Sequence, residues 1–522
     1  MQTYLGQEKQ SVNTLYDCIR MHADRNPGKT YLLTERKILT YGEAAQITGN
    51  AADMFRKCGM KKGDLVALRA TRSPDTVLLS AAVGAVGAIA VMTDPHIGIE
   101  PYIAEAGSDI QPAFWLTNEK NSRDLDAEGG WELRFGDNVC KIPLGSGAPG
   151  AFREPELPSV SPEDPFMIIF TSGSTGTSKA VLLSHRNWLA NPEGAMALFA
   201  EGEKDRAIAL IPLHHVLGFA AVVCATYCGH DVLFPSSVRP DHVLSCIGKY
   251  RVTCMYAVPT FFMELIRGGG CARYDLSSLR FGLMAGAPFT PGQIEETEKK
   301  LGMRILPGYG MSECIVISIG RYDDSAELRA SGAGRLFPMT EIRFENGAGT
   351  DRESEGEICV RGATRMLGYY EGGKTDRDNP DSDGWMHTGD LGYMDAEGVL
   401  HISGRKKDII IRNGNNLSSA EIERKLLSIP FVFAAAVTGV PDPKCGELPY
   451  AAVVTDPKYG MITETEIREK AGMVLNKLMM PVEIRILPSL PLMSSGKVDK
   501  KKIREIFVGG ATSRFDEYVR YV

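Results

Sequence analysis

The sequence predicts an α/β protein: a large N-terminal domain of α/β layers with a β-rich subdomain, followed by a small α+β C-terminal domain. Three observations predict this fold class. Short apolar, β-branched runs alternate with helical stretches through most of the chain, short alternating runs among turn residues cover 353–393, and a new unit begins after residue 405. At 522 residues the chain also exceeds what one hydrophobic core can serve, so two or more domains are expected.

The first part of the chain alternates between predicted strands and helices. The runs 168–170, 207–211 and 254–258 are apolar, and each is followed by a Gly, Pro or Ser/Thr break and a helical pattern. This order is typical of α/β layers. The apolar segment 77–92 is rich in Ala and Gly and shorter than the roughly 20 residues that a bilayer requires. We therefore expect a buried helix there and no transmembrane segment.

A second unit follows the stretch 401–405. Ser418 and Glu421 have the spacing of a capping box, which predicts that a helix begins at this point. The runs 434–437 and 448–454 read as strands, and another helical pattern follows the second of them. We place the domain boundary after residue 406, so that the N-terminal domain is 1–406 and the C-terminal domain is 407–522.

Composition excludes some classes of function. With 58 basic and 65 acidic residues the net charge is −7, which argues against a nucleic-acid-binding protein. The eleven cysteines are odd in number and show no repeated spacing, and the N-terminus lacks the basic and apolar regions of a signal peptide. We therefore expect reduced thiols in a cytoplasmic protein. The pair Cys224 and Cys228 has too weak a spacing to predict a zinc site.

The loop 171–179, Thr-Ser-Gly-Ser-Thr-Gly-Thr-Ser-Lys, is the most informative segment. It follows an apolar strand and offers six hydroxyls, two glycines and one lysine. Glycines let backbone N–H groups turn toward an anion, hydroxyls add donors, and lysine adds charge. The chemistry is that of a phosphate-binding loop, although the spacing of Gly173, Gly176 and Lys179 is not that of a Walker A loop. A flexible Ser/Gly loop is the alternative.

This loop resembles the signature of the adenylate-forming superfamily, which includes acyl- and aryl-CoA synthetases, luciferases and peptide-synthetase adenylation domains. Other segments match in the family's order over roughly residues 40–505. They are 212–215, 284–288, 309–313, 356–358 with 368–370, 385–390, 404–408 with Gly414 and 421–423, and Pro491 with 496–498. The family has Pro and Gly where this chain has Ser178 and Ala180; neither departure removes a donor, so we expect activity to survive.

The resemblance implies a binding site for ATP and for coenzyme A. It assigns to this site Thr171, Ser172, Gly173, Ser174, Thr175, Gly176, Lys179, Gly286, Ala287, Pro288, Tyr309, Gly310, Ser312, Asp390, Arg405 and Gly414. Asp390, which the sequence displays on a turn after Gly389, is expected to accept the ribose hydroxyls. Arg405 is expected to share the ribose or phosphate contact, and Gly414 to let a thiol arm pass close to the backbone.

Lys497, Glu313 and His215 are the residues that the resemblance implies for catalysis. Glu313 is expected to hold Mg2+ against the phosphates of ATP. Lys497 is expected to neutralise two approaching anions, the acid's carboxylate and the α-phosphate. Lys500 and the two lysines after it have no such argument, so we expect them at the surface. His215 is expected to line the acid pocket without acting as a base.

A hinge at Lys407 is implied as well, about which a mobile C-terminal domain rotates between two steps. The implied activity is ATP-dependent acid–thiol ligation. A fatty or aryl carboxylic acid becomes acyl-AMP with release of pyrophosphate, and then an acyl-CoA thioester. An amino-acid substrate is disfavoured because 216–223 offers no carboxylate to pair with a buried ammonium group.

Three other activities stay open at this point. The acyl group passes to a separate carrier protein, an adenylate is oxidised as in luciferases, or the chain binds nucleotide without catalysis. The presence of Lys179, Glu313 and Lys497 favours catalysis. Gly286 and Gly308 suggest room for a long or bulky acid. The sequence does not predict which acid is used or the oligomeric state.

Overall fold

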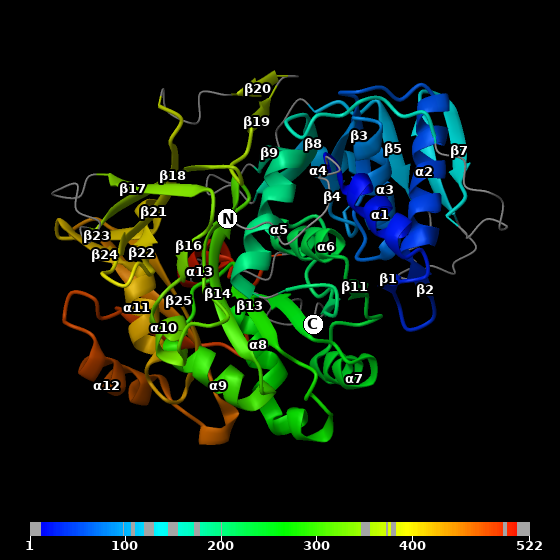
Figure 1. Cartoon of the computed structure of the whole chain (residues 1–522). Coiled ribbons are helices and arrows are strands. Elements are labelled where there is room, and N and C mark those ends of the chain that lie inside the picture. Colours follow the sequence, from blue (N-terminus) through cyan, green and yellow to red (C-terminus); the bar gives the residue numbers. More distant parts are fainter. Residues whose placement is uncertain are drawn as a thin grey trace.

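The computed structural model describes residues 12–97, 99–105, 110–118, 130–144, 155–171, 178–199, 201–345, 355–371, 374–376, 383–493 and 498–508. Within these ranges, the chain up to Arg405 forms two nine-stranded sheets, a four-stranded sheet and helices, which we call the large part. The rest of the chain forms a five-stranded sheet with its helices (Figure 1). The predicted fold class, α/β with a small α+β unit after it, is confirmed.

The first nine-stranded sheet carries most of the parallel pairing. Its strands in spatial order are β16 (Arg335–Leu336), β15 (Cys314–Ile319), β14 (Arg304–Met311), β13 (Phe281–Ala285), β12 (Cys254–Ala257), β10 (Arg206–Ile208), β11 (Asp231–Leu233), β1 (Thr30–Leu33) and β2 (Ile38–Thr40). From β14 to β1 every neighbour is parallel. In parallel sheets, ligands bind outside the carboxyl ends of the strands, so the loops that follow these strands are candidates for a site.

The second nine-stranded sheet is parallel only at its centre. Its strands in spatial order are β20 (Lys374–Asp376), β19 (Gly368–Glu371), β9 (Lys179–Ser184), β8 (Pro165–Thr171), β4 (Ile89–Thr93), β3 (Leu65–Arg69), β5 (Phe114–Thr117), β6 (Trp131–Phe135) and β7 (Asn138–Ile142). The expected single helix over 77–92 is therefore wrong in part. This buried segment contains the end of one helix, a tight turn at Gly87 (φ +76) and most of β4.

Helices fill the space between and around the two sheets. Those of the large part are α1 (Leu15–Arg25), α2 (Tyr41–Lys57), α3 (Pro74–Ala85), α4 (Ile99–Glu105), α5 (His185–Phe199), α6 (Val216–Cys228), α7 (Pro240–Tyr250), α8 (Pro259–Ile266), the 3-10 helix η1 (Arg267–Arg273), α9 (Pro291–Leu301) and α10 (Ala326–Ser331). Helix α5 contacts β9 of one sheet and β15 of the other. Helix α6 beside it is apolar on every face, which fits a helix enclosed between the first sheet, where it contacts β10, β11, β12 and β15, and helices α1 and α5.

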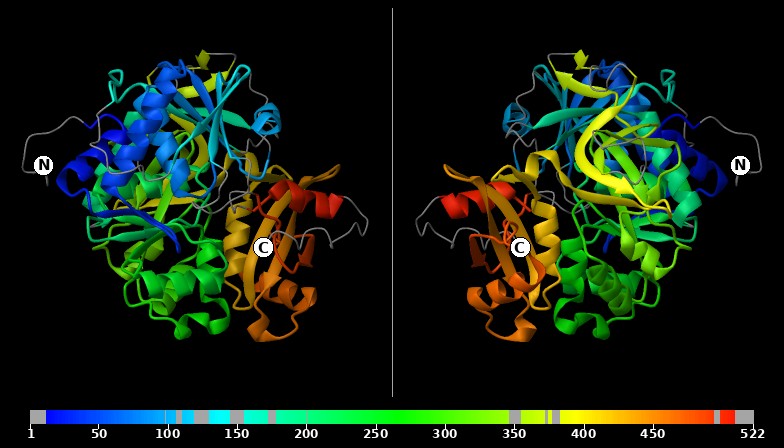
Figure 2. Two further views of the ribbon diagram at one scale, coloured as in Figure 1. Left: turned by 90° about the vertical axis from the view of Figure 1, so that its right-hand side faces the viewer. Right: turned by 90° about the vertical axis from the view of Figure 1, so that its left-hand side faces the viewer.

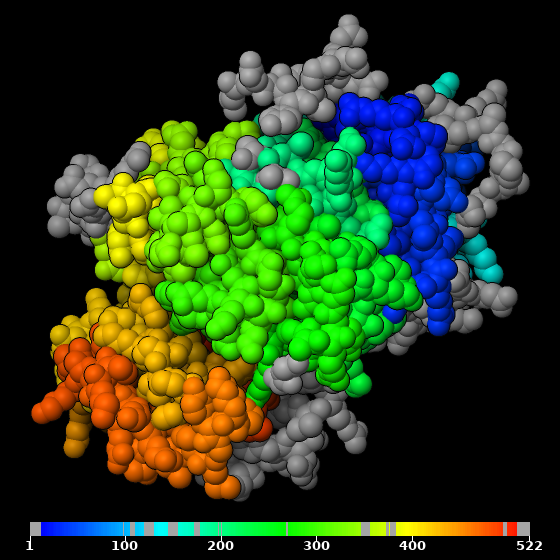
Figure 3. Space-filling view, turned by 60° about the horizontal axis from the view of Figure 1, so that its bottom comes forward, coloured from blue at the N-terminus to red at the C-terminus, as the bar shows by residue number. Residues whose placement is uncertain are grey.

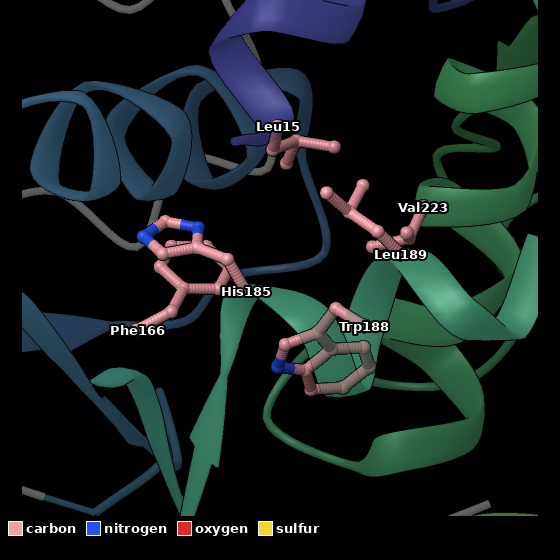
Figure 4. Close-up of a pocket in the computed structure, with 6 residues that line it drawn as sticks. All are labelled: Leu15, Phe166, His185, Trp188, Leu189 and Val223. Atoms are coloured by element: carbon pink, nitrogen blue, oxygen red, sulfur yellow. The ribbon is translucent and has the colours of Figure 1, made fainter. Parts of the chain in front are cut away.

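Figure 4 shows a small hollow in this core, between α1, α5, α6 and β8. Its lining is Leu15, Phe166, His185, Trp188, Leu189 and Val223. The rings of Phe166 and His185 stack with centroids 4.5 Å apart. Burial lowers the pKa of His185 to about 4, so the imidazole is neutral at physiological pH. The hollow is lined mainly by apolar groups and is a feature of core packing.

The β-rich segment predicted over 353–393 is present and serves two sheets. The four-stranded sheet consists of β17 (Thr340–Glu345), β18 (Gly356–Gly362), β21 (Met386–Met394) and β22 (Leu400–Arg405). Strands β19 and β20 from the same segment leave it and join the second nine-stranded sheet, where β19 pairs with β9. This crossover brings residues near 369 against residues near 181.

The end of the chain forms a separate lobe (Figures 2 and 3). Its elements are the 3-10 turn η2 (Lys406–Asp408), β23 (Ile409–Arg412), β24 (Asn415–Ser418), α11 (Ser419–Leu427), β25 (Val432–Asp442), β26 (Gly446–Thr455), η3 (Pro457–Tyr459), α12 (Glu464–Val474), β27 (Glu483–Ile486) and α13 (Lys500–Val508). Ser418 accepts a hydrogen bond from the backbone N–H of Glu421, so the predicted helix start is confirmed. In the part of the chain that the structure describes, the helices are all too short or too polar to cross a bilayer.

Candidate active site

The glycine- and hydroxyl-rich loop is held by the last rung of a hairpin. Thr171 at the end of β8 pairs with Lys179 at the start of β9. Antiparallel partners lie about 5 Å apart at Cα, so the two ends of the loop are adjacent. Five predicted residues, Ser172, Gly173, Ser174, Thr175 and Gly176, lie outside the described residues. Ser178 and Ala180 flank Lys179 at the start of β9.

Tyr369 links the loop lysine to Glu313. Its ring lies 4.5 Å from Lys179 Nζ, measured to the ring centroid, and its hydroxyl donates to Glu313 Oε1 at 2.9 Å. The contact exists because β19 pairs with β9, opposite Val181. Sequence reasoning quoted Tyr369 only as part of a structural motif and did not assign it to the site.

Glu313 occupies a two-residue turn. Met311 pairs with Cys314, so Ser312 and Glu313 connect β14 to β15 directly. The Glu313 carbonyl accepts from the Met366 N–H at 2.8 Å, which holds the turn against the chain that leads into β19. The turn cannot shift without breaking that contact, so the backbone of Glu313 is held in place beside β19.

Asp390 is a buried carboxylate between a phenol and a guanidinium. It is 2% exposed. The Tyr309 hydroxyl donates to its Oδ2 at 2.7 Å, and Arg405 Nε lies 2.6 Å from its Oδ1. Burial, and to a lesser extent the negative charge of Asp390, raises the pKa of Tyr309 well above its ordinary value. The phenol therefore keeps its proton and remains a donor. Tyr309 and Arg405, both predicted for the nucleotide site, are thus in direct contact with Asp390, the residue predicted to bind the ribose.

The expectation that Asp390 lies on a turn is wrong. Asp390 is inside β21 and pairs with Arg405 of β22. Gly389 before it has φ +72, and the β18–β21 register shifts near Glu357. The Thr-Gly-Asp sequence therefore forms an irregularity within a ladder, because strands on both sides satisfy its backbone groups.

Glu357 joins the Asp390 segment to the start of the end lobe. Its Oε1 accepts from the Gly389 N–H at 3.1 Å, and its Oε2 lies 2.5 Å from Lys406 Nζ and 3.2 Å from His387 Nδ1. Burial alone would raise the pKa of Glu357, but Lys406 and His387 hold it below its usual range. Sequence reasoning quoted Glu357 as part of a motif without giving it a role.

Lys407 lies in η2, where the chain leaves the four-stranded sheet. Burial lowers the pKa of Lys407, and the charge of Arg405 lowers it further, while Asp408, Asp390 and Glu313 oppose this effect. The ammonium group is therefore within electrostatic reach of the two carboxylates assigned to nucleotide and Mg2+.

The expectation that Lys500 is a plain surface residue is wrong. Lys500 Nζ lies 2.9 Å from Glu423 Oε1, donates to Ser419 Oγ at 2.8 Å, and lies 3.6 Å from Asp408 Oδ2 beside Lys407. It turns inward because Glu423 is buried and needs a charged partner.

Lys497 lies outside the described residues. Leu492 and Val498, on either side of that segment, form an antiparallel bridge. Lys500, three residues after Lys497 in the sequence, lies 3.6 Å from Asp408 Oδ2 beside η2.

His215 is the N-cap residue of α6, at the carboxyl end of the β10 segment. His214 beside it is 2% exposed, with ring centroids 4.2 Å apart and His214 Nε2 3.7 Å from Asp94 Oδ2. Burial, and to a lesser extent the nearby charge of His96, lowers the pKa of His214 to about 4. A Cβ on Gly218 would lie 2.3 Å from the Pro212 carbonyl, so this loop packs tightly on the first turn of α6.

Gly286, Ala287 and Pro288 follow β13, again at a carboxyl end, and Gly286 has φ +87. Gly308 does not provide room for an acid, contrary to expectation. A Cβ there would lie 3.1 Å from Leu283 Cδ1 and 3.5 Å from Ala285 Cβ, so this glycine serves close packing of β14 on β13.

The local backbone requires glycine at position 310 and favours it at position 414. A Cβ on Gly310 would lie 2.3 Å from the Ile315 carbonyl across the hairpin. Asn413 and Gly414 have φ 51 and 76 and join β23 to β24, the conformation of a two-residue hairpin turn with left-handed residues. The space around Gly414 is open to 4 Å among the described atoms.

Together these residues fit a magnesium nucleotide. Asp390 is a buried acceptor for hydroxyl groups, and Lys179 is a cation at the edge of the phosphate-binding loop. Glu313 Oε1 is oriented by Tyr369, while Oε2 accepts no hydrogen bond from a described residue. A carboxylate oxygen is the ligand type that Mg2+ prefers.

Known proteins match almost the whole chain. Residues 19–370 match the family described as AMP-binding enzyme, and residues 421–497 match the AMP-binding enzyme C-terminal domain. A feruloyl-CoA synthase from an Amycolatopsis species is 30% identical over 473 residues, covering 90% of this chain and 94% of that protein. A sulfoacetate–CoA ligase from Cupriavidus necator is 29% identical over 516 residues, covering 95% and 98%.

Two solved structures share the fold. ATP-bound MatB from Rhodopseudomonas palustris has a TM-score of 0.80 and 25% identity, covering 94% of this chain and 99% of that one. The o-succinylbenzoate CoA synthetase of Bacillus subtilis, in complex with its acyl-adenylate intermediate, has a TM-score of 0.76 and 25% identity, covering 93% and 97%. The resemblance found in the sequence motifs is confirmed.

Proposed function

This chain belongs to the AMP-binding enzyme family, and we propose that within it the chain works as an ATP-dependent acid–CoA ligase. It activates a carboxylic acid as acyl-AMP, releases pyrophosphate, and then forms the acyl-CoA thioester. Its relatives include a feruloyl-CoA synthase and a sulfoacetate–CoA ligase, both of which by name join an acid to coenzyme A.

The observation that carries this proposal is the contact of Tyr369 with both Lys179 and Glu313. It joins the phosphate-binding loop and a carboxylate suited to Mg2+ in one cluster. The phosphates of ATP need both positive charge and a held cation at the same place. Glu313 would hold Mg2+, which would supply positive charge beside the phosphate oxygens.

In the first step a carboxylate oxygen of the acid forms a bond to the α-phosphorus of ATP. The bond from that phosphorus to the oxygen bridging the β-phosphate breaks, and pyrophosphate leaves. Asp390 holds the ribose hydroxyls and Lys179 the phosphates. Lys497 supplies the charge that lets the two anions approach, since unscreened carboxylate and phosphate repel each other.

In the second step the thiol of coenzyme A attacks the acyl carbon of the adenylate and AMP leaves. We propose that 407–522 rotates as a unit about Lys407 to allow this, and that Gly414 then faces the thiol arm. The Lys406–Glu357 contact supports a boundary at this point, because it fixes the last residue before the hinge to the four-stranded sheet. After Lys407 the chain enters a different sheet.

The acid side of the site begins at His215 and the enclosed helix α6. Among the described residues of α6 none is charged, so the pocket suits a fatty or aryl acid better than an amino acid. Coenzyme A is the acceptor in this proposal, and a separate carrier protein is the alternative. All eleven cysteines are free thiols, which supports a cytoplasmic location.

The test is pyrophosphate release from ATP across a panel of aliphatic and aromatic acids, with and without coenzyme A. We expect acid-dependent release and formation of the matching acyl-CoA. Acid-dependent release without thioester formation for any acid would favour a carrier protein as acceptor. ATP binding without pyrophosphate release for any acid would contradict the proposal and indicate nucleotide binding alone.

A further inference from the structure

We propose that Glu35, His242 and Cys246 form a binding site for one divalent transition-metal cation of the zinc class, on the large part of the protein and separate from the nucleotide site. Local sequence spacing does not indicate this site, because Glu35 is far from the other two residues along the chain. The site is independent of the proposed ligase activity.

The three ligand atoms lie within a few tenths of an ångström of tetrahedral spacing. His242 Nε2 is 2.9 Å from Glu35 Oε1 and 3.6 Å from Cys246 Sγ, and Sγ is 3.9 Å from Oε1. Tetrahedral zinc with bonds of about 2.0–2.3 Å keeps neighbouring ligand atoms about 3.3–3.8 Å apart. Shifts of a few tenths of an ångström would therefore admit the ion, and imidazole, thiolate and carboxylate are its ordinary ligands.

A helix and a strand connection hold the ligands. His242 and Cys246 are four residues apart on α7, which places both side chains on one helix face. Glu35 comes from the connection between β1 and β2, which lies beside α7 (Figure 1). The Ser236 N–H donates to Glu35 Oε2 at 2.8 Å, so that oxygen is anchored and Oε1 faces His242.

An ion can enter this cluster, and the carboxylate charge is available to it. The side chains of His242 and Glu35 are 32% and 25% exposed. Among the described residues, neither lysine nor arginine forms an ion pair with Glu35. Cys246 is buried. This burial, and to a lesser extent the negative charge of Glu35, raises the pKa of its thiol to about 11. Its proton passes to solvent when Sγ bonds to the metal.

Two other clusters of ligand-type residues are less suited. In the cluster Glu345, Glu357, Cys359 and His387, both carboxylates already pair with cations, Arg343 and Lys406. In the cluster Glu201, His230 and Cys254, every member is buried, and His230 Nε2 bonds Glu201 Oε1 at 2.8 Å. An ion would have to displace an existing partner in either place. At Glu35 the ion replaces contacts among the three ligands themselves and the contact of His242 with the Ser236 hydroxyl, and it displaces no lysine or arginine partner among the described residues.

Ser236 gives the site a connection to the central sheet. Its Oγ lies 3.3 Å from His242 Nε2, so this hydroxyl or a water molecule can complete four-fold coordination. Ser236 follows Pro235. The carbonyls of Pro235 and Ala209 both accept a hydrogen bond from the Arg72 guanidinium. A bound ion therefore joins α7, the β1–β2 connection and the chain after β11. By mass action it stabilises the folded protein.

The test uses the full chain freed of metal by a chelator and titrated with Co2+. We expect one Co2+ per chain and a sulfur-to-cobalt charge-transfer absorption. Cys246→Ser should abolish that absorption, and His242→Gln should weaken Co2+ binding by at least about tenfold, the lower bound for loss of even an outer-shell partner. Zn2+ should raise the Tm of the wild-type chain and leave that of His242→Gln unchanged.

Cys359→Ser and Cys445→Ser are the matched controls, because each removes one thiol elsewhere. Both should retain the charge-transfer absorption. Its loss in Cys359→Ser and survival in Cys246→Ser would place the ion in the other cluster and overturn the proposal. Absence of the absorption in the wild-type chain would overturn it as well. Circular dichroism and acid-dependent pyrophosphate release, both retained in Cys246→Ser, show that the variant is folded.

Discussion

The Tyr369 hydroxyl donates a hydrogen bond to Glu313 Oε1 over 2.9 Å, although 56 residues separate the two along the chain. The contact orients the carboxylate that we assign to Mg2+. It depends on β19 leaving the β-rich segment to pair with β9. That pairing places the Tyr369 ring over Lys179 and its hydroxyl against the Glu313 turn.

Tyr369→Phe should slow acid-dependent pyrophosphate release by about tenfold, because a hydrogen bond to a charged group contributes about 1.5 kcal/mol or more. The Mg2+ concentration for half-maximal rate should rise, since Glu313 is no longer oriented. Tyr370→Phe is the matched control, one residue away on the opposite face of β19. Equal rates in both variants would remove the role assigned to Tyr369.

Asp390→Ala should weaken ATP binding by about tenfold or more, because it removes an acceptor and leaves Arg405 without its partner. Isothermal titration with MgATP measures the effect. Asp395→Ala is the control: Asp395 bonds His401 at 2.7 Å at the far end of the same pair of strands. Unchanged ATP affinity in Asp390→Ala would contradict the ribose assignment.

The order of motifs along the chain singled out Tyr309, Asp390 and Arg405, which the structure brings into contact. It could not predict contacts that depend on pairing between distant strands. Tyr369 is the clearest case, since its role follows only from the register of β19 on β9. The turn expected at Asp390 failed for the same reason. The local sequence Thr-Gly-Asp favours a turn, but pairing with β18 on one side and β22 on the other keeps it in a strand.

Side-chain direction was the other limit. The basic run around Lys500 reads as a solvated face, yet α13 packs Ile503 and Phe507 inward and turns Lys500 toward buried Glu423. Gly308 likewise suggested space, while the space beside it is filled by Leu283 of the neighbouring strand. A sequence shows which residues are small or charged; the fold decides what lies next to them.

Lys497→Ala should nearly abolish acid-dependent pyrophosphate release, because nothing then offsets repulsion between the acid and the α-phosphate. Thioester formation from pre-made acyl-AMP should persist, since that step has no such approach of two anions. Lys501→Ala, at an exposed position on α13, is the control. If both half-reactions fell equally in Lys497→Ala, the residue would have a different role.

Lys407→Pro should impair thioester formation from acyl-AMP more than adenylate formation, because proline fixes φ and blocks the backbone change that rotation requires. Lys407→Ala is the control for loss of the side chain, whose ammonium lies near Asp390 and Glu313. The two half-reactions are measured separately for each variant. An equal loss in both half-reactions for Lys407→Pro, beyond that of Lys407→Ala, would rule out the hinge.

His185 should make the fold sensitive to mild acid. Its pKa is about 4 in the folded chain against an ordinary value of 6.5, so between these values the unfolded chain binds a proton that the folded chain does not. Stability contributed by the neutral ring is therefore present above pH 6.5 and is lost as pH falls toward 4. For one such group the loss between pH 7 and pH 5 is about 2 kcal/mol. His185→Gln should show a smaller loss in urea unfolding over that range. The same pH dependence in His185→Gln and wild type would show that this imidazole does not contribute.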